Sequence, residues 1–182
     1  MIDITNGGWL QVVNACDART VDFKMCCALY MAAAMSVHDY EPSFAGSNSN
    51  NGTAVLSVYG TFRPLSSKNY FYGCTMQDGS AIDLSGQTGS FSTTSAFTKG
   101  SNYLKFAADA NVTVNLAGRA GLPALAHERG LIMTWTEDTA PAASVTFQVD
   151  AETRRAGFKV VRDDEHNALR LARASGFRII VK

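Results

Sequence analysis

Acidic residues are the first candidates for chemistry in this chain of 182 residues. They fall into two groups, the turn residues Asp78, Asp83 and Asp109 and the consecutive run Asp163, Asp164 and Glu165. Two carboxyl groups held about 5–10 Å apart, with different pKa values, can cleave a glycosidic bond. A polysaccharide lyase would also need a base, and Arg119 is the basic residue near a predicted turn. Because acids in polar turns are usually solvated, we expect no catalytic residue, and a polysaccharide-active protein remains the alternative.

The sequence contains no recognisable motif for a metal site, a catalytic nucleophile or a nucleotide cofactor. The three histidines, His38, His127 and His166, lie far apart in the sequence, and His127 and His166 each adjoin a glutamate. Adjacent residues of a strand point to opposite faces and rarely share a metal. The chain also lacks a G-x-S-x-G elbow, a P-loop and a dinucleotide fingerprint. We therefore expect no metal site and no cofactor.

An aromatic triplet supplies the ligand-binding hypothesis. In a strand, Tyr70 and Tyr72 lie on one face and Phe71 on the other. Exposed tyrosines can stack on sugar rings, and a nearby acid such as Asp83 can bind the hydroxyl groups. A glycan contact at Tyr70, Tyr72 and Asp83 is therefore one interpretation. The alternative is that Phe71 is a core residue and both tyrosines are partly exposed packing residues.

The overall composition favours an extracellular β-structure. Lysine and arginine number 16, as do aspartate and glutamate, so the formal charge is zero. A neutral chain lacks the basic footprint of a nucleic-acid-binding protein, and we expect no nucleic-acid partner. Only 18% of the residues are charged, which is typical of secreted or cell-surface domains. The cysteines, Cys16, Cys26, Cys27 and Cys74, form no C-x-x-C pair, so buried thiols are predicted, with a Cys16–Cys26 or Cys27–Cys74 disulfide as the alternative.

The N-terminal part, residues 1–38, is predicted to contain a short strand and a helix. Ile2–Thr5 alternates in polarity, whereas apolar residues recur at helical spacing over residues 18–37. Asp17 or Thr20 could cap this helix. The apolar run Met25–Val37 is shorter than the roughly 20 residues that span a bilayer, so no transmembrane segment is expected. A helix that is apolar nearly all round must be covered, and we expect it to cap the open end of a β-structure.

A polar linker over residues 39–52 precedes a β-rich domain over residues 53–182. Short strand patterns alternate there with Gly, Asn, Asp and Ser, and one helical turn is expected at Thr153–Ala156. The predicted strands are Ala54–Phe62, Tyr70–Met76, Ala81–Leu84, Gly89–Thr93, Tyr103–Ala107, Val112–Leu116, Leu131–Thr136, Ser144–Val149, Phe158–Arg162, Ala168–Ala172 and Phe177–Val181.

A weak internal repeat predicts how these strands are arranged. Ile82, Leu84, Gly86 and Gly89 match Val114, Leu116, Gly118 and Gly121, each pair being 32 residues apart. Repeated units of this kind bury their apolar faces by stacking on one another, which predicts a parallel β-solenoid. An antiparallel β-sandwich, with evenly spaced hairpins, is the alternative.

Two sequence phrases carry a family resemblance. The segment 58–64, VYGTFRP, and the segment 72–86, YGCTMQDGSAIDLSG, resemble the C-terminal part of autotransporter-like, β-helical bacterial surface proteins. The segments 147–153 and 176–182 are similar to the closing coils of those proteins, so the resemblance covers about residues 52–182. It implies a right-handed parallel β-helix at the cell surface that acts as a stalk, adhesin or passenger. The helical N-terminus predicted above departs from that pattern.

The sequence therefore favours a non-catalytic structural or adhesive module, secreted or on a bacterial cell surface. The alternatives are a carbohydrate-binding or carbohydrate-active β-helix, and a β-sandwich subunit of an oligomeric shell or fibre. Glycans or other surface proteins are the expected partners. The last predicted strand, Phe177–Val181, could also pair with another copy, because an unpaired strand edge is a template for association.

Overall fold

The computed structural model shows a mainly β chain whose described strands form three sheets. It describes the strands at residues 2–4, 9–12, 16–25, 28–31, 35–42 and 48–50, and the segments 56–64, 74–94 and 103–174. Side-chain surroundings are described for residues 36–39 and for those three longer segments. Phe177–Val181, Tyr70 and Tyr72 lie outside the described residues.

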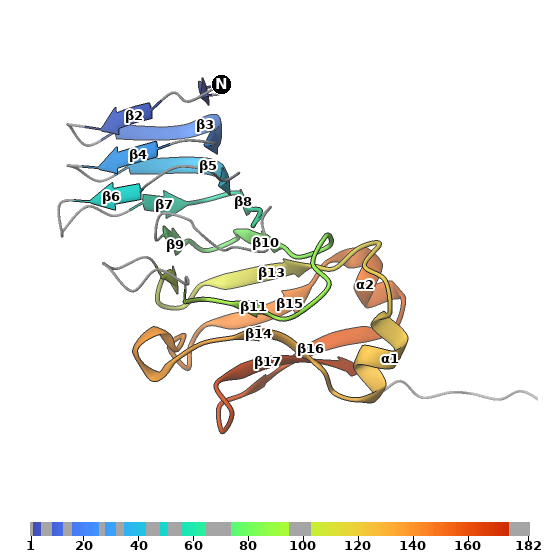
Figure 1. Cartoon of the computed structure of the whole chain (residues 1–182). Helices are drawn as coiled ribbons and strands as arrows, with labels where there is room; N and C mark the ends of the chain where they lie inside the picture. Colours follow the sequence, from blue (N-terminus) through green and yellow to red (C-terminus); the bar gives the residue numbers. More distant parts are fainter. Residues whose placement is uncertain are drawn as a thin grey trace, which may run out of the picture.

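The largest sheet has ten strands, and all of its pairs are parallel (Figure 1). Its members are β1 (Ile2–Ile4), β3 (Cys16–Met25), β5 (Met35–Pro42), β7 (Leu56–Val58), β8 (Thr61–Phe62), β9 (Cys74–Met76), β10 (Ala81–Asp83), β12 (Leu104–Phe106), β13 (Asn111–Asn115) and β15 (Thr146–Val149). Parallel neighbours cannot be joined by tight hairpins. The alternative prediction of an antiparallel sandwich is therefore wrong for this sheet.

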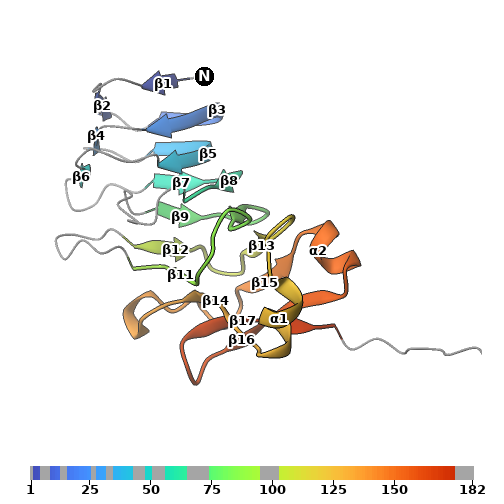
Figure 2. The ribbon, with the colours of Figure 1, turned by 45° about the vertical axis from the view of Figure 1, so that its right-hand side comes forward.

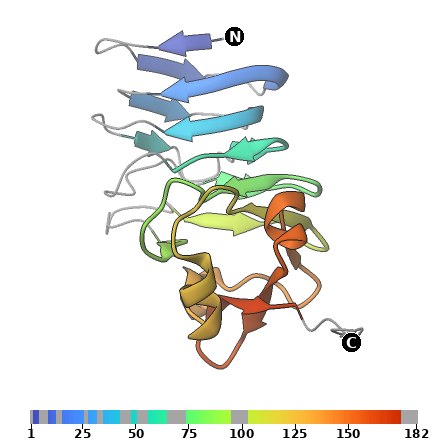
Figure 3. The ribbon, with the colours of Figure 1, turned by 90° about the vertical axis from the view of Figure 1, so that its right-hand side faces the viewer.

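The other described strands form two smaller sheets. One of them is a parallel sheet that lies along one side of the stack of strands formed by the ten-stranded sheet (Figure 2). It consists of β2 (Trp9–Val12), β4 (Ala28–Met31) and β6 (Asn48–Asn50). In the third sheet, β11 (Phe91–Ser92) pairs parallel with β14 (Leu131–Thr134). β14 then pairs antiparallel with β17 (Ala168–Arg173), and β17 with β16 (Phe158–Asp163). This antiparallel part and the helices α1 (Leu122–His127) and α2 (Ala151–Arg155) lie at the end of the stack opposite the N-terminus (Figure 3).

The predicted N-terminal helix over residues 18–37 is wrong. The described residues of that segment belong to strands β3, β4 and β5, and β3 pairs in register with β5 from Cys16 opposite Met35 to Ala18 opposite Val37. A strand of a parallel sheet is covered on both faces and can be apolar on both. Its sequence then cannot be distinguished from a buried helix by periodicity. The predicted linker also contributes strands, because β5 runs to Pro42 and β6 spans Asn48–Asn50, and β5 pairs with β7 and β8 beyond residue 52.

Apolar residues of successive parallel strands form straight interior columns. Leu56 pairs with Cys74, 18 residues later, and Cys74 pairs with Leu104, 30 residues later. A second set, the Phe62 column, consists of Phe62, Ile82, Val114 and Val149. All members of both columns are at most 4% exposed. The pairing of Ile82 with Val114 has the 32-residue offset found in the sequence comparison.

Most predicted strands of the C-terminal two-thirds are confirmed where the structure describes them, and α2 confirms the predicted turn near Thr153. Helix α1 was not predicted. It begins after Gly121, which has a φ of 75°, and carries Pro123 in its first turn. A proline in the first turn is a common sequence signature of a helix start.

Cys74 is a free, buried thiol. The buried-thiol prediction is confirmed for this residue, and the alternative Cys27–Cys74 disulfide is wrong. Burial raises the pKa of the Cys74 thiol, because a thiolate would lose its hydration in the apolar interior.

Gly60 marks a close approach between neighbouring strands of the stack. A Cβ atom at this position would lie 2.6 Å from the His38 carbonyl oxygen and 2.5 Å from Asp39 Oδ1. Gly60→Ala should therefore lower the free energy of unfolding by about 1–3 kcal/mol, the usual cost of overpacking. Gly86→Ala is the matched control, since a Cβ atom at Gly86 would have no neighbour within 4 Å, and it should change stability by less than about 1 kcal/mol. Urea unfolding followed by circular dichroism compares the two; equal stabilities would contradict the close approach.

Candidate functional site

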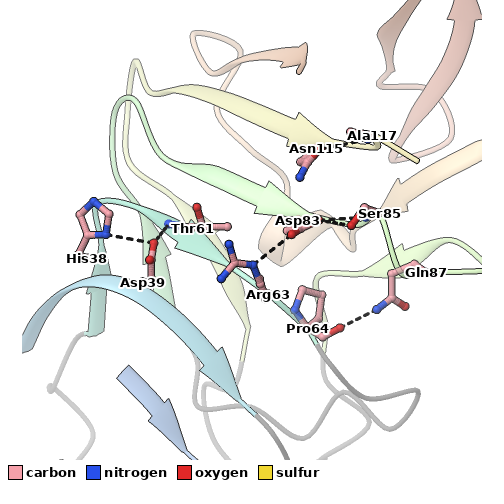
Figure 4. Close-up of polar contacts among 10 residues, drawn as sticks. All are labelled: His38, Asp39, Thr61, Arg63, Pro64, Asp83, Ser85, Gln87, Asn115 and Ala117. Atoms are coloured by element: carbon pink, nitrogen blue, oxygen red, sulfur yellow. Dashed lines mark hydrogen bonds and ion pairs between the residues drawn. The ribbon is translucent and has the colours of Figure 1, made fainter. Parts of the chain in front are cut away.

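Asp83 ends strand β10 and is bonded to neighbouring polar groups on both of its oxygens (Figure 4). Arg63 Nε donates to Asp83 Oδ2 at 3.1 Å. The Ser85 amide and hydroxyl donate to Asp83 Oδ1 at 3.1 and 2.7 Å. Because both oxygens of Asp83 already accept hydrogen bonds from the protein, its side chain is held in place and is suited to orienting a ligand or a neighbouring side chain.

A shallow groove of about 170 Å³ opens beside Asp83. Its walls come from Arg63, Pro64, Asp83, Ser85, Gly86 and Gln87. Gln87 Nε2 donates to the Pro64 carbonyl at 2.6 Å, which ties the turn after β10 to the segment after β8. The groove offers a guanidinium, a carboxylate, a hydroxyl and an amide, and these groups suit a polar ligand rich in hydroxyls. The other predicted ligand residues, Tyr70 and Tyr72, lie outside the described residues, so the predicted three-residue site is not tested.

The polar residues one position beyond the Phe62 column form a corner column of Arg63, Asp83, Asn115 and Asp150. Asn115 Oδ1 accepts from the Ala117 amide at 3.0 Å, in the same way that Asp83 accepts from the Ser85 amide. Asp150 Oδ2 accepts from the Leu116 amide on the preceding strand segment at 2.9 Å. These side chains therefore pair the amides at the corners, where the sheet ladder ends.

The backbone register extends the corner column toward the N-terminus. Asp3 pairs with Lys24 and Lys24 with Glu41. Tyr40, the neighbour of Glu41, pairs with Phe62, the neighbour of Arg63. Acidic and basic residues thus alternate at this register position from Asp3 of β1 to Asp83 of β10.

A second polar cluster lies on the β16–β17 hairpin. Asp163 Oδ2 accepts from Arg170 Nε at 2.5 Å, and Asp163 Oδ1 lies 2.9 Å from His166 Nδ1. Arg170 Nη1 also donates to the Arg129 carbonyl oxygen at 3.1 Å. The cluster borders a groove of about 500 Å³ on the outer face of the hairpin. The sequence associated Asp163 only with its acidic neighbours Asp164 and Glu165. Its partner Arg170 is seven residues away and comes into contact only through the register of the hairpin.

The hydrogen bond from Arg170, supported by the one from His166, lowers the pKa of Asp163 to about 2. The ordinary aspartate pKa in an unfolded chain is about 3.9. The folded state therefore gains stability from ionised Asp163 above about pH 4, and this gain disappears as the pH falls toward about 2.

Asp163→Asn should accordingly reduce stability at neutral pH and flatten the dependence of stability on pH between about pH 4 and 2. The measurement is urea unfolding of the wild type and the variant over that range. Two parallel curves with a constant difference would contradict the assigned role of the Asp163 carboxylate.

Asp78 and Arg119, two further residues considered in the sequence analysis, have structural partners. Asp78 Oδ1 accepts from the amide and the side chain of Asn111, both at 2.8 Å, and these bonds lower the pKa of Asp78. Arg119 is buried and donates to the Gly89 carbonyl at 3.1 Å, and burial lowers its pKa. Within the described residues, no three His, Cys, Asp or Glu side chains are grouped so that they could hold a metal ion.

The fold and site define a mainly β protein with parallel stacking and polar corners. No protein-family model, curated protein or solved structure matches the chain. In the part of the chain that is described, no helix has the length and apolar character needed to cross a membrane.

Proposed function

We propose that this chain is a non-catalytic structural or adhesive module of a bacterial cell surface, built as a right-handed parallel β-helix. The observation that carries the proposal is the set of buried columns that run in register through the parallel strands, such as Phe62, Ile82, Val114 and Val149. A unit with so short a strand cannot bury its apolar face alone, so each one is stabilised by its neighbours. The product is an extended, stiff body, which suits a stalk or a display scaffold.

The outward-facing residues support a display role. Ser36, Ser57, Thr75 and Lys105 occupy one register position on four successive strands, and all four are partly or fully exposed. Gln77 Nε2 donates to Ser57 Oγ at 3.2 Å, which links two neighbouring turns through their surface groups. Hydroxyl groups hydrate a strand face without adding charge, in keeping with a neutral secreted protein.

The test is the location of the protein on intact cells of its source organism. Antibodies raised against the purified chain should label unpermeabilised cells, and brief external protease treatment should remove the label. A cytoplasmic marker treated in parallel controls for lysis. Labelling that requires permeabilisation would refute a surface role.

Carbohydrate binding at the Asp83 groove is a second candidate function. It is favoured by the convergence of Arg63, Asp83, Ser85 and Gln87 on one shallow, solvent-facing groove. A glycan array probed with the labelled wild-type chain should then give hits that Asp83→Ala weakens and Gly86→Ser, at the groove wall, alters. Tyr72→Ala tests the aromatic part of the same hypothesis. An array without hits removes this candidate and leaves the structural proposal standing.

A further inference from the structure

The groove on the β16–β17 hairpin has an uneven distribution of charge. Arg170 and Arg162 are paired with Asp163 and Asp164. Arg129, Lys159 and Arg173 also line the groove, and none of the three forms an ion pair with another described residue. Their side chains therefore leave positive charge available at this end of the molecule, although the whole chain is neutral.

Two of the cations without an ion pair lie at the open end of the hairpin, whereas the acids lie toward its turn. Lys159 pairs with Ala172, and Arg173 with Phe158, at the open end of the hairpin. Glu165 and His166 belong to the connecting turn at the other end. An acidic ligand would therefore place its charges toward Lys159 and Arg173 and avoid the turn.

Exposed apolar side chains lie next to these cations. Val161 is 42% exposed and Leu131 is 36% exposed, and both are paired with Arg170 in the sheet. Leu131 and Val161 are two of the three large exposed hydrophobic residues in the part of the chain that is described. Along β16, Lys159 and Val161 lie on the same face, two residues apart. Along this face of β16 a cation is therefore followed, at the spacing of a β-strand, by an apolar group and then by Asp163, whose charge is paired with Arg170.

We propose that this groove binds an extended, acidic peptide segment of a partner protein, in which acidic and apolar residues alternate on the bound face. Same-face residues of an extended peptide repeat about every 7 Å, which is the spacing at which β16 presents Lys159 and Val161. The carboxylates would contact Lys159, Arg173 and Arg129, and the apolar side chains would cover Val161 and Leu131. A sulfated or carboxylated glycan could use the cations but would gain nothing from the two apolar residues. This inference concerns a surface separate from the Asp83 groove and goes beyond the structural role proposed above.

The test is fluorescence anisotropy with the full chain and labelled peptides. A peptide of repeating Asp-Ser-Val-Ser units, which places acidic and apolar residues alternately on one face, is the probe. An Asp-Ser-Ser-Ser repeat lacks the apolar residues, and a Lys-Ser-Val-Ser repeat reverses the charge. We expect the first peptide to bind at least about tenfold more tightly than either control, because both the charge and the apolar contact are needed. Affinity should fall as sodium chloride is added.

Two exposed substitutions locate the site. Lys159→Glu should weaken binding about tenfold through charge repulsion, and Val161→Ser should weaken it several-fold through the lost apolar contact. Lys105→Glu, at the exposed position of β12, makes the same charge change outside the groove and should leave binding within about twofold of the wild type. Thermal melting confirms that each variant is folded.

Three results would overturn the proposal. The first is equal binding of the peptides with and without valine. The second is a loss of affinity with Lys105→Glu as large as that with Lys159→Glu. The third is tight binding of a heparin fragment that Val161→Ser leaves unchanged, since this would assign the groove to polyanionic glycans.

Discussion

Phe62→Ala is expected to lower the free energy of unfolding by about 3–5 kcal/mol, the range for removal of a buried aromatic ring. Phe62 is fully buried between strand β5 and Ile82 of β10 in the Phe62 column. Its ring meets the ring of Phe91 edge to face, with centroids 6.0 Å apart. The substitution removes this contact and leaves a cavity that a stack of parallel strands cannot readily close, because each strand is held by hydrogen bonds on both sides.

Urea unfolding at neutral pH, followed by circular dichroism, measures this effect. Phe62→Leu retains most of the volume and should cost less than about 2 kcal/mol. Val161→Ala is the control, because it shortens an exposed apolar side chain on a strand. Its free energy of unfolding should remain within about 0.5 kcal/mol of the wild-type value. If Phe62→Ala were no more destabilising than Val161→Ala, the interior columns would not be the source of stability.

Asp150→Ala is expected to cost about 2–4 kcal/mol, because one carboxylate serves both the sheet and a helix. Asp150 Oδ1 accepts from the Thr153 amide at 2.9 Å and thereby caps helix α2. Asp150 Oδ2 accepts from the Thr153 hydroxyl at 2.6 Å and from the Leu116 amide at 2.9 Å. Removal of the side chain leaves both amides without these acceptors.

The controls separate the cap from the link between strands. Asp150→Asn keeps one acceptor oxygen for the cap but turns an amide donor toward the Leu116 N–H, so an intermediate loss is expected. Glu152→Ala, at an exposed site in the first turn of α2, should cost less than about 1 kcal/mol. A loss for Asp150→Ala no larger than that for Glu152→Ala would contradict the double role.

The direction of the pKa shift of Asp150 predicts how its contribution to stability depends on pH. Burial alone would raise the pKa of Asp150, but the hydrogen bonds from Thr153, Leu116 and Glu152 outweigh it and hold the pKa below its ordinary value. The stabilisation by Asp150 should therefore be complete above about pH 4 and decline at lower pH, as for Asp163. The Asp150→Asn variant should lose that part of the pH dependence.

The local pattern of apolar and turn-forming residues was sufficient to predict the strands of the C-terminal two-thirds. Alternating residues such as Val112, Thr113 and Val114 bury every second side chain, and Gly and Asp at the turns mark where each strand ends. The 32-residue offset between Ile82 and Val114 in the sequence repeat is also the register in which β10 pairs with β13. These features depend on neighbouring residues along the chain and on a period of two, and one sequence displays them directly.

The tertiary structure decided the rest. Segment 18–37 has apolar residues at helical spacing, and only the pairing of β3 with β1 and β5, and of β4 with β2 and β6, makes its described residues strand rather than helix. Arg170 approaches Asp163 because an antiparallel hairpin folds back on itself, and Arg63 approaches Asp83 because parallel strands align residues 20 apart. The two-residue period of a strand is a property of the backbone, so it can be recognised from neighbouring residues in the sequence. The partners across a sheet depend on register and crossover length, which are fixed by the packing of the whole chain.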